Sequence, residues 1–208
     1  MKFLILFLTL SSLVCRPAIA GENPQKAEYV GDRTVLGVNY NSLLYKAVIT
    51  FRDYQFSGLV LIKNQEKDSA VHVVFMSEFG LTMLDVKYKN DVFELVSGKE
   101  FLSSPRLLEV ICDDFRIVLQ DFGHIGKYKD KETCREGVGK VKFAHLSGTF
   151  IYLYRPGFKV EKATWRKNLA RVVKVFITRD AATLPQKIRF THRGVSLEVN
   201  MELINYKQ

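Results

Sequence analysis

The stretch VVFMSEFGLTMLDVKY, from Val73 to Tyr88, decides the fold class. Two apolar runs flank the segment Glu78-Phe79-Gly80, in which Gly80 is free to adopt a positive φ. Both runs have the length and the β-branched and aromatic content of strands, so the stretch predicts an antiparallel hairpin. Neither run alternates cleanly between apolar and polar residues, and apolar side chains therefore project from both faces. Another part of the molecule must cover this apolar surface.

Runs of the same kind recur along the chain from Leu43 onward, at roughly the 8 to 12 residue spacing of antiparallel β structure. The segment Asp121–Lys140 contains glycines and alternating charges, so we expect a loop or a loosely paired hairpin there. The turns between the other runs are rich in charged residues, Gly and Pro. About eleven strands are expected: Leu44–Tyr54, Phe56–Lys63, Ala70–Ser77, Leu81–Lys89, Val92–Val96, Val141–Leu146, Gly148–Tyr154, Phe158–Trp165, Ala170–Thr178, Lys187–His192 and Val195–Leu203.

The periodicity changes in SSPRLLEVICDDFRIVLQ, from Ser103 to Gln120. Ser103 or Ser104 is a suitable N-cap, and Pro105 suits the first helical turn because its missing N–H has no intrahelical partner there. The sequence therefore predicts one main helix over about residues 104–119. Its apolar face follows the i, i+3, i+4, i+7 and i+11 spacing, with Leu108, Ile111, Cys112, Phe115 and Leu119.

One helix of this size cannot shelter eleven apolar strands, because about sixteen residues span only about 24 Å. The sheet must curl around its own side chains, stack on itself as a sandwich, or enclose a cavity that accepts an apolar ligand. A sealed, dry core is the alternative to the cavity. The expected fold is mainly β with α (α+β): an antiparallel, strongly curved sheet or incomplete β-barrel packed on the main helix.

The first twenty residues have the pattern of a secretory signal: Lys2, an apolar stretch from Phe3 to Val14, and Ala18-Ile19-Ala20 before Gly21. The apolar stretch spans about 18 Å, which is too short to cross a bilayer of about 30 Å. Cys15 at its end offers a second interpretation, a lipoprotein signal with Cys15 as the lipidated residue. Both interpretations predict export, to the periplasm or as an outer-membrane lipoprotein. Residues 21–42 are expected to form a polar arm, and residues 43–208 a single domain.

Export places Cys112 and Cys134 in an oxidising compartment, where they can pair as a disulfide or remain separate thiols. The formal net charge is +9, to which Lys2 and Arg16 contribute two charges, and the sequence contains no run of five basic residues. Such a spread excess is typical of solvated strand faces. If the charge has a function, an anionic membrane surface or acidic glycans suit an exported protein better than nucleic acid does.

No catalytic or metal-binding signature occurs in the sequence. The four histidines stand singly, without zinc-site spacing, and Ser147 lies in an expected turn rather than in a Gly-x-Ser-x-Gly elbow. Asp113 and Asp114 are adjacent and are expected on the solvated face of the helix. We therefore expect no enzymatic activity, no cofactor, no metal and no nucleic-acid partner.

Together with the closing LPQKIRFTHRGVSLEVNMELI, the segments FSGLVLIKN, VHVVFMSEFGLTMLDVKY and SSPRLLEVICDDFRIVL resemble exported or lipid-anchored proteins of Bacteroidetes-type bacteria. Those proteins in turn resemble the LolA/LolB-like fold of periplasmic lipoprotein carriers and outer-membrane lipoprotein acceptors. The resemblance covers about Leu43 to Ile204. It implies an incomplete barrel that wraps helices around an acyl-chain cavity, and no functional residue is carried over from it.

The first functional hypothesis is an exported, non-enzymatic module that binds a lipid or an acylated protein in an apolar cavity between sheet and helix. The alternative is a lipid-anchored structural or assembly factor at the outer membrane, whose strand edges bind other envelope proteins. For the first hypothesis the expected cavity lining is Phe75, Met83, Ile111, Phe115, Phe150 and Tyr152.

Overall fold

The computed structural model describes residues 35–37, 40–65, 69–99, 105–119, 131–135, 138–145, 147–155, 159–168, 171–179 and 184–207. The chain divides into two compact units, Met1–Val30 and Gly31–Gln208, and all described residues belong to the second. The expected signal segment, Cys15 and most of the expected polar arm lie outside the described residues.

The described residues form twelve strands and one helix, which confirms the mainly β class. The helix begins and ends within a residue of the bounds that its periodicity predicts. In chain order the elements are β1 (Ser42–Phe51), β2 (Tyr54–Gln65), β3 (Ala70–Met76), β4 (Thr82–Lys89), β5 (Val92–Gly98), α1 (Pro105–Leu119), β6 (Lys131–Arg135), β7 (Val138–His145), β8 (Gly148–Arg155), β9 (Lys159–Arg166), β10 (Val172–Arg179), β11 (Pro185–Arg193) and β12 (Leu197–Lys207).

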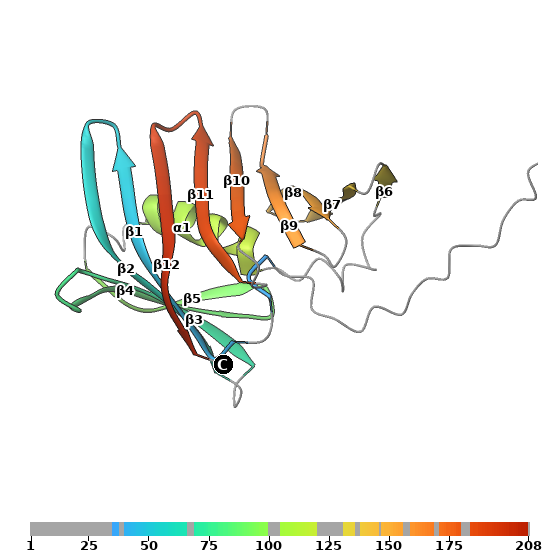
Figure 1. The fold of residues 1–208 in the computed structure, drawn as a ribbon. Helices are drawn as coiled ribbons and strands as arrows, with labels where there is room; N and C mark the ends of the chain where they lie inside the picture. Colours follow the sequence, from blue (N-terminus) through green and yellow to red (C-terminus); the bar gives the residue numbers. More distant parts are fainter. Residues whose placement is uncertain are drawn as a thin grey trace, which may run out of the picture. The chain divides into compact units, whose positions relative to one another are not determined.

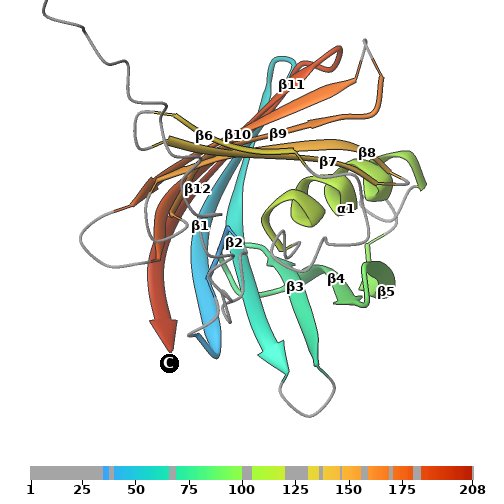
Figure 2. The ribbon, with the colours of Figure 1, turned by 90° about the vertical axis from the view of Figure 1, so that its right-hand side faces the viewer.

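All twelve strands belong to one sheet with the order β5-β4-β3-β2-β1-β12-β11-β10-β9-β8-β7-β6. Every described neighbouring pair is antiparallel. The sheet is open and strongly curved, it does not close into a barrel, and α1 lies on its concave side (Figures 1 and 2). The sandwich alternative is therefore wrong, because a single sheet curls around its own side chains.

The additional strand arises in the segment expected as a loop or a loosely paired hairpin. β6 pairs with β7 from Lys131↔Lys142 to Arg135↔Val138, so the hairpin alternative is correct. The sequence of β6, KETCR, has no alternation of apolar and polar residues. This strand lies at one end of the sheet. Pattern reading therefore counts eleven strands where the structure has twelve.

One hydrophobic core fills the space between the concave face and α1. Alternate residues of the strands point into it, and the backbone of α1 lies close to that of β9. The core includes Val35, Leu36 and Tyr40, which lie upstream of the expected domain start at Leu43. Its largest fully buried side chains are Trp165, Tyr45, Tyr152, Phe150 and Phe190.

Candidate functional site

The two halves of α1 differ in how deeply they are buried. Ile117 and Val118 in the C-terminal half are completely buried, and Leu119 is nearly so. The apolar residues Leu107, Leu108 and Ile111 of the N-terminal half are only half-buried, as is Phe115 one turn before the end of the helix, and all four pack against the same core. The N-terminal half of the helix therefore leaves apolar surface within reach of solvent on the concave side.

The six expected lining residues fall into two groups. Phe75 on β3 and Met83 on β4 are half-buried, as are Ile111 and Phe115 on α1, and all four pack against the core. Phe150 and Tyr152 on β8 are completely buried, with parallel rings 6.4 Å apart. The Tyr152 hydroxyl donates a hydrogen bond of 2.9 Å to the carbonyl oxygen of Ile117, which fixes the C-terminal half of α1 to the sheet.

A glycine on β2 creates the space in which the Phe75 ring lies. A Cβ atom added to Gly58 would lie 2.9 Å from the Phe75 ring and 2.5 Å from the carbonyl oxygen of Met76, so a side chain does not fit there. Because Phe75 pairs with Val60, two residues along the same face of β2, its ring extends over Gly58 toward the end of the strand. The ring therefore remains accessible from that end of the sheet.

The apolar surface continues to the edge of the concave side at the β1–β2 turn. Phe56 pairs with Ile49 and lies on the same face of β2 as Gly58 and Val60, yet it is 52% exposed. Phe51 on β1 is 38% exposed on the same side. Single exposed apolar residues are ordinary in proteins, but a row that leads from the solvent to a half-buried cluster is typical of a binding groove.

Two hollows that the described residues border lie away from these six side chains. One of about 950 Å³ opens on the outer face of the sheet, where Leu44 and Leu61 are cross-strand neighbours and Lys63 and Lys207 stand at the margin. A second of about 10 Å³, about the size of one water molecule, lies beside His192. None of the six expected lining residues borders either hollow, and their role in ligand binding remains a prediction.

Asp113 and Asp114 are buried, and the expectation that they lie on the solvated face of the helix is wrong. Each is 6% exposed, because the curved sheet covers α1 on more than one side. Asp114 accepts from His192 Nε2 at 2.9 and 3.0 Å, while Nδ1 of the same ring lies 2.9 Å from the carbonyl oxygen of Leu197. That carbonyl can only accept, so Nδ1 carries a proton. The ring donates to Asp114 through Nε2 when His192 is protonated, and the short distance to that carboxylate favours the protonated form.

Burial by itself lowers the pKa of His192, but the Asp114 carboxylate and the Leu197 carbonyl outweigh it and raise the pKa. Asp113 lies 3.2 Å from Arg116 and 3.2 Å from Arg171, although burial still raises its pKa. The guanidinium group of Arg171 also stands 5.6 Å from the Trp165 ring. This buried cluster ties α1 to β9, β10 and β11.

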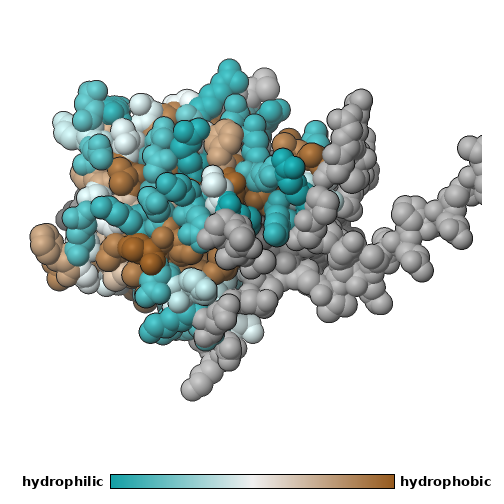
Figure 3. All heavy atoms as spheres, in the orientation of Figure 1, coloured by the Kyte–Doolittle hydropathy of each residue, from teal (hydrophilic) through white to brown (hydrophobic). Residues whose placement is uncertain are grey.

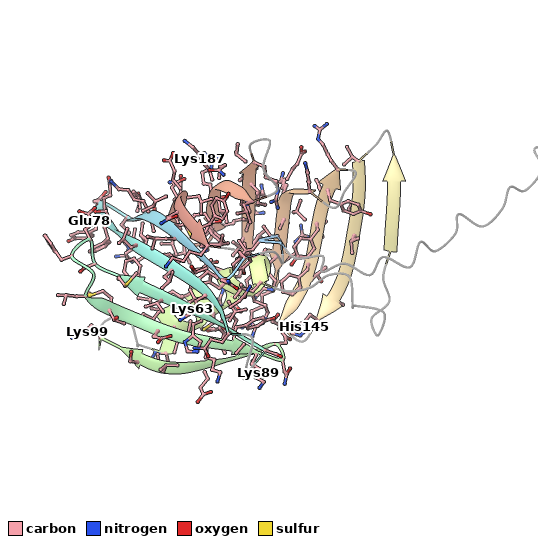
Figure 4. All side chains as sticks on the ribbon, turned by 60° about the horizontal axis from the view of Figure 1, so that its bottom comes forward. Lys63, Glu78, Lys89, Lys99, His145 and Lys187 are labelled. Atoms are coloured by element: carbon pink, nitrogen blue, oxygen red, sulfur yellow. The ribbon has the colours of Figure 1, made fainter. Side chains whose placement is uncertain are left out.

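Asp91, in the β4–β5 turn, joins distant parts of the sheet to the helix. It accepts from Arg116 Nε and from the Tyr88 hydroxyl, each at 3.1 Å, and it contacts His145 Nε2 at the end of β7. Figure 4 shows His145 beside the strand end that bears Lys89. The left-handed backbone of Asn90 and Asp91, with φ of 50° and 64°, forms the tight turn that presents this carboxylate.

Ser147 completes a serine, histidine and aspartate arrangement with His145 and Asp91, and its Oγ lies 2.8 Å from His145 Nδ1. The backbone N–H of Ser147 donates to the same Nδ1 atom at 3.0 Å, so it occupies the lone pair that a general base needs. The Asp91 carboxylate also pairs with Arg116. This geometry supports a structural clasp between β4–β5, α1 and β7 rather than an activated nucleophile.

Cys112 is a free, half-buried thiol on α1, and burial raises its pKa to about 11. The side chain of Cys134 lies outside the described residues, so its pairing with Cys112 remains a prediction. In the part of the chain that the structure describes, no group of three or more potential ligand side chains could hold a metal ion. The same part contains no helix with the length and apolar content needed to cross a membrane.

Local sequence spacing could not reveal the buried His192 pair, because its partners are 78 residues apart. The one local hint in the sequence is that the charged pair Asp113 and Asp114 interrupts an otherwise apolar segment of α1. Two adjacent carboxylates in a helix are typical of a solvent-exposed face, but in the structure both are buried and each has a charged or protonatable partner.

Comparison with solved structures finds proteins from two bacteria that align with most of the chain. A DUF1329 family protein from Desulfovibrio piger matches with a TM-score of 0.51 and 11% sequence identity, over 81% of this chain and 86% of its own. The two chains share a fold. The lipoprotein LppX of Mycobacterium tuberculosis aligns at a TM-score of 0.31 and 11% identity, over 82% of this chain and 88% of its own, and no argument rests on it. No family model and no curated protein sequence matches the chain.

Proposed function

We propose that the chain is an exported, non-enzymatic module of the bacterial cell envelope that binds a lipid or an acylated protein. The acyl chain lies between the N-terminal half of α1 and the concave face of β3 and β4. The observation that carries this proposal is the row of half-buried apolar side chains on both elements, which continues to the exposed Phe51 and Phe56. Phe75, Met83, Ile111 and Phe115 form its walls, and the buried Phe150 and Tyr152 form the closed end.

The driving force is the removal of apolar surface from water. Each buried methylene group contributes about 0.8 kcal/mol, so a chain of ten methylenes gains about 8 kcal/mol before the cost of immobilising it. The groove walls contribute as well, because their half-buried side chains lose their remaining contact with water. Met83 adds adaptability, since an unbranched thioether adjusts its rotamer to chains of different shape.

Binding of a fluorescent fatty acid to the purified, folded protein tests the proposal. We expect saturable enhancement of the fluorescence, and displacement of the probe by an unlabelled diacyl lipid. A linear, non-saturating response at all protein concentrations would contradict the proposal.

Two matched variants separate binding in the groove from adsorption elsewhere. Phe75→Gln removes a half-buried phenyl ring from the concave side, and Phe176→Gln removes a half-buried phenyl ring from the outer face of β10. We expect Phe75→Gln to weaken probe binding about tenfold, since loss of part of a phenyl contact costs about 1.4 kcal/mol, and Phe176→Gln to leave it unchanged. Equal effects of the two changes would exclude the concave groove as the site.

The ends of the sheet favour a second function, the docking of envelope proteins. β5 stands at one end of the strand order, and most of its residues are exposed, with Val92 64% and Val96 52% accessible. An end strand of this kind can accept a strand from a partner. Cross-linking in cells through a photoreactive residue at Val92 tests this. A specific adduct that disappears when Val96→Pro removes a backbone donor supports docking, and the absence of any adduct contradicts it.

Mass spectrometry of the mature N-terminus distinguishes the two export routes. A diacylated Cys15 identifies a lipoprotein anchored in a membrane, and an N-terminal Gly21 identifies a soluble periplasmic protein. An unprocessed Met1 in exported material would contradict both routes.

A further inference from the structure

A row of alternating basic and apolar side chains crosses the outer face of the sheet. The cross-strand register places Lys140, Leu153, Lys162, Phe176 and Arg189 side by side on β7 to β11. A neighbour of each along its strand is buried in the core, so these five side chains point away from α1; the buried neighbours are Val141, Tyr152, Ala163, Val175 and Ile188. With strands about 4.8 Å apart, the row is about 19 Å long.

Cation–π contacts hold the middle of this row in place. Lys162 Nζ stands 5.2 Å and the guanidinium carbon of Arg189 5.1 Å from the centre of the Phe176 ring, one on each neighbouring strand. Both cations remain next to a half-buried aromatic ring rather than next to a carboxylate. The positive charge of the row is therefore available to a partner.

The rows on either side carry further positive charge. They contribute exposed basic side chains from four of the five strands, and hydrophilic residues cover most of the face of β10–β12 that Figure 3 turns to the viewer. Of these side chains, Lys187 forms an ion pair with Glu202 of β12 at 3.2 Å. The flanking residues are Lys142, Arg166, Lys174, Lys187 and Arg193.

Acidic side chains are nearly absent from this part of the sheet. The sequences of β7 to β11 include a single acidic residue, Glu161, and it pairs with Arg155 at 2.5 Å. The acidic groups of the other strands include Asp85, Glu94 and Glu198. The charge is therefore asymmetric within the sheet, which the spread of Lys and Arg along the sequence conceals.

The chemistry of this face fits a flat, anionic and partly apolar partner. Half-buried Ile151, Leu153 and Phe176 lie between the cations, and long lysine stems can rest on an apolar layer while their ammonium groups contact phosphates. A bilayer that contains anionic lipid offers both layers over an area of this size. A soluble polyanion offers only the charges.

We propose that the outer face of β7–β11, called here the basic face, docks the protein on an anionic phospholipid bilayer. The groove between α1 and β3–β4 lies on the opposite side of the sheet and remains open when the basic face is in contact. This inference is independent of the proposed acyl-chain binding, and the two are measured separately.

Sedimentation of the purified protein with vesicles tests the proposal. We expect binding to phosphatidylcholine vesicles that contain phosphatidylglycerol, and much weaker binding to phosphatidylcholine alone, which reports any contribution of the apolar residues Phe3 to Val14. Raising the salt concentration from about 0.1 M to about 1 M shortens the Debye length from about 10 Å to about 3 Å and should release the protein. Binding that is equally strong to both vesicle types would overturn the proposal.

Two triple variants with the same change in net charge locate the docking surface. Lys140→Glu, Lys162→Glu and Arg189→Glu reverse three charges of the basic face. Lys63→Glu on β2, Lys89→Glu at the end of β4 and Lys99→Glu directly after β5 reverse three exposed charges outside the basic face. Figure 4 shows Lys187 of the basic face on the side of the sheet away from Lys89 and Lys99. We expect the first set to weaken partitioning about 100-fold or more, and the second set to weaken it less than tenfold.

A milder variant and a fatty-acid binding control guard against misfolding of the charge-reversal variant. If the reversal variant fails to fold by circular dichroism, Lys140→Met, Lys162→Met and Arg189→Met replace it, with an expected loss of about 10-fold or more. The fluorescent fatty acid should bind equally to wild type and to the basic-face variants, which separates docking from groove binding. Equal losses in both triple variants, or binding to a soluble polyanionic glycan without binding to vesicles, would overturn the proposal.

Discussion

At the scale of single residues, the buried pair His192 and Asp114 makes the free energy of unfolding depend on pH. The pKa of His192 is raised in the folded protein, so its pairing stabilises the fold fully below the pKa of an unfolded histidine, about 6.5. That stabilisation is lost as the pH rises through the raised pKa. Asp114→Asn keeps the shape of the side chain but removes its charge.

We expect Asp114→Asn to lower the free energy of unfolding by about 2 kcal/mol at pH 6, the size of a hydrogen bond to a charged group. We also expect it to flatten the fall in stability above about pH 6.5. Urea unfolding between pH 5.5 and about 8.5 measures both effects. The control is Asp85→Asn, which removes the partner of the more exposed His72, 3.1 Å away, and should cost at most about 1 kcal/mol. Unchanged pH dependence in Asp114→Asn would show that the pair is not coupled to folding.

Cys112 gives a second prediction at this scale. Burial raises its pKa to about 11, so the reactive thiolate is scarce at neutral pH. We expect very slow reaction with a thiol reagent in the folded protein and rapid reaction in denaturant without reductant. Peptide mapping identifies the modified cysteine. If Cys112 reacts in denaturant only after reduction, it is paired in a disulfide, as export makes conceivable for Cys112 and Cys134.

At the scale of secondary structure, the docking of α1 explains which parts of the site the sequence could predict. The spacing of Leu108, Ile111 and Phe115 fixes the existence and bounds of the helix, because a 3.6-residue period is a local property. The same spacing marks these residues as apolar contacts, but it cannot show that the sheet leaves Ile111 half-buried and covers Asp114. Burial depends on sheet curvature, and that is set by strand pairings across the whole chain.

The strands show the same limit. Length and β-branched and aromatic content predict β3 and β4 closely, whereas the short, polar β6 lacks this signal and is covered only by the hairpin alternative. Phe150 and Tyr152 alternate along β8 as a lining residue would, and so they were grouped with Phe75 and Met83. Only the structure shows that β8 faces the buried half of α1, where Tyr152 contacts Ile117.

The hydrogen bond between Tyr152 and Ile117 gives a prediction for the helix. Ile117 is two residues from the end of α1, where carbonyl groups lack intrahelical partners, and the Tyr152 hydroxyl supplies one. We expect Tyr152→Phe to lower the free energy of unfolding by about 1 to 2 kcal/mol. Tyr206→Phe, at a tyrosine that is 46% exposed, is the matched control and should change it by less than about 0.5 kcal/mol. Equal stability of both variants would contradict a role for this bond in docking α1.

At the scale of the whole domain, the two faces of one curved sheet have different chemistry. The concave side carries α1, the core and the row of half-buried apolar side chains, while the outer face of β7–β11 carries the basic face. The sequence places apolar residues on both faces of the strands, and something must cover each face. In the structure, the concave face is covered because the sheet curves around its own side chains and α1 packs against them. On the outer face, Leu153 and Phe176 alternate with Lys and Arg side chains that keep the surface hydrated.

A single core across all parts of the sheet predicts cooperative unfolding. Trp165, the only tryptophan, is 1% exposed on β9, and it belongs to the same hydrophobic cluster as Val73 and Leu84 of β3 and β4. We therefore expect its fluorescence and the far-ultraviolet circular dichroism to change with the same midpoint in urea. Trp165→Phe combined with Phe93→Trp moves the fluorescent reporter to β5, at the other end of the strand order. In this double variant we expect the fluorescence and the circular dichroism to share one midpoint again. Separate midpoints for the two reporters would mean that β1–β5 and β7–β11 unfold independently, and that α1 can separate from β3 and β4 without loss of the rest of the sheet.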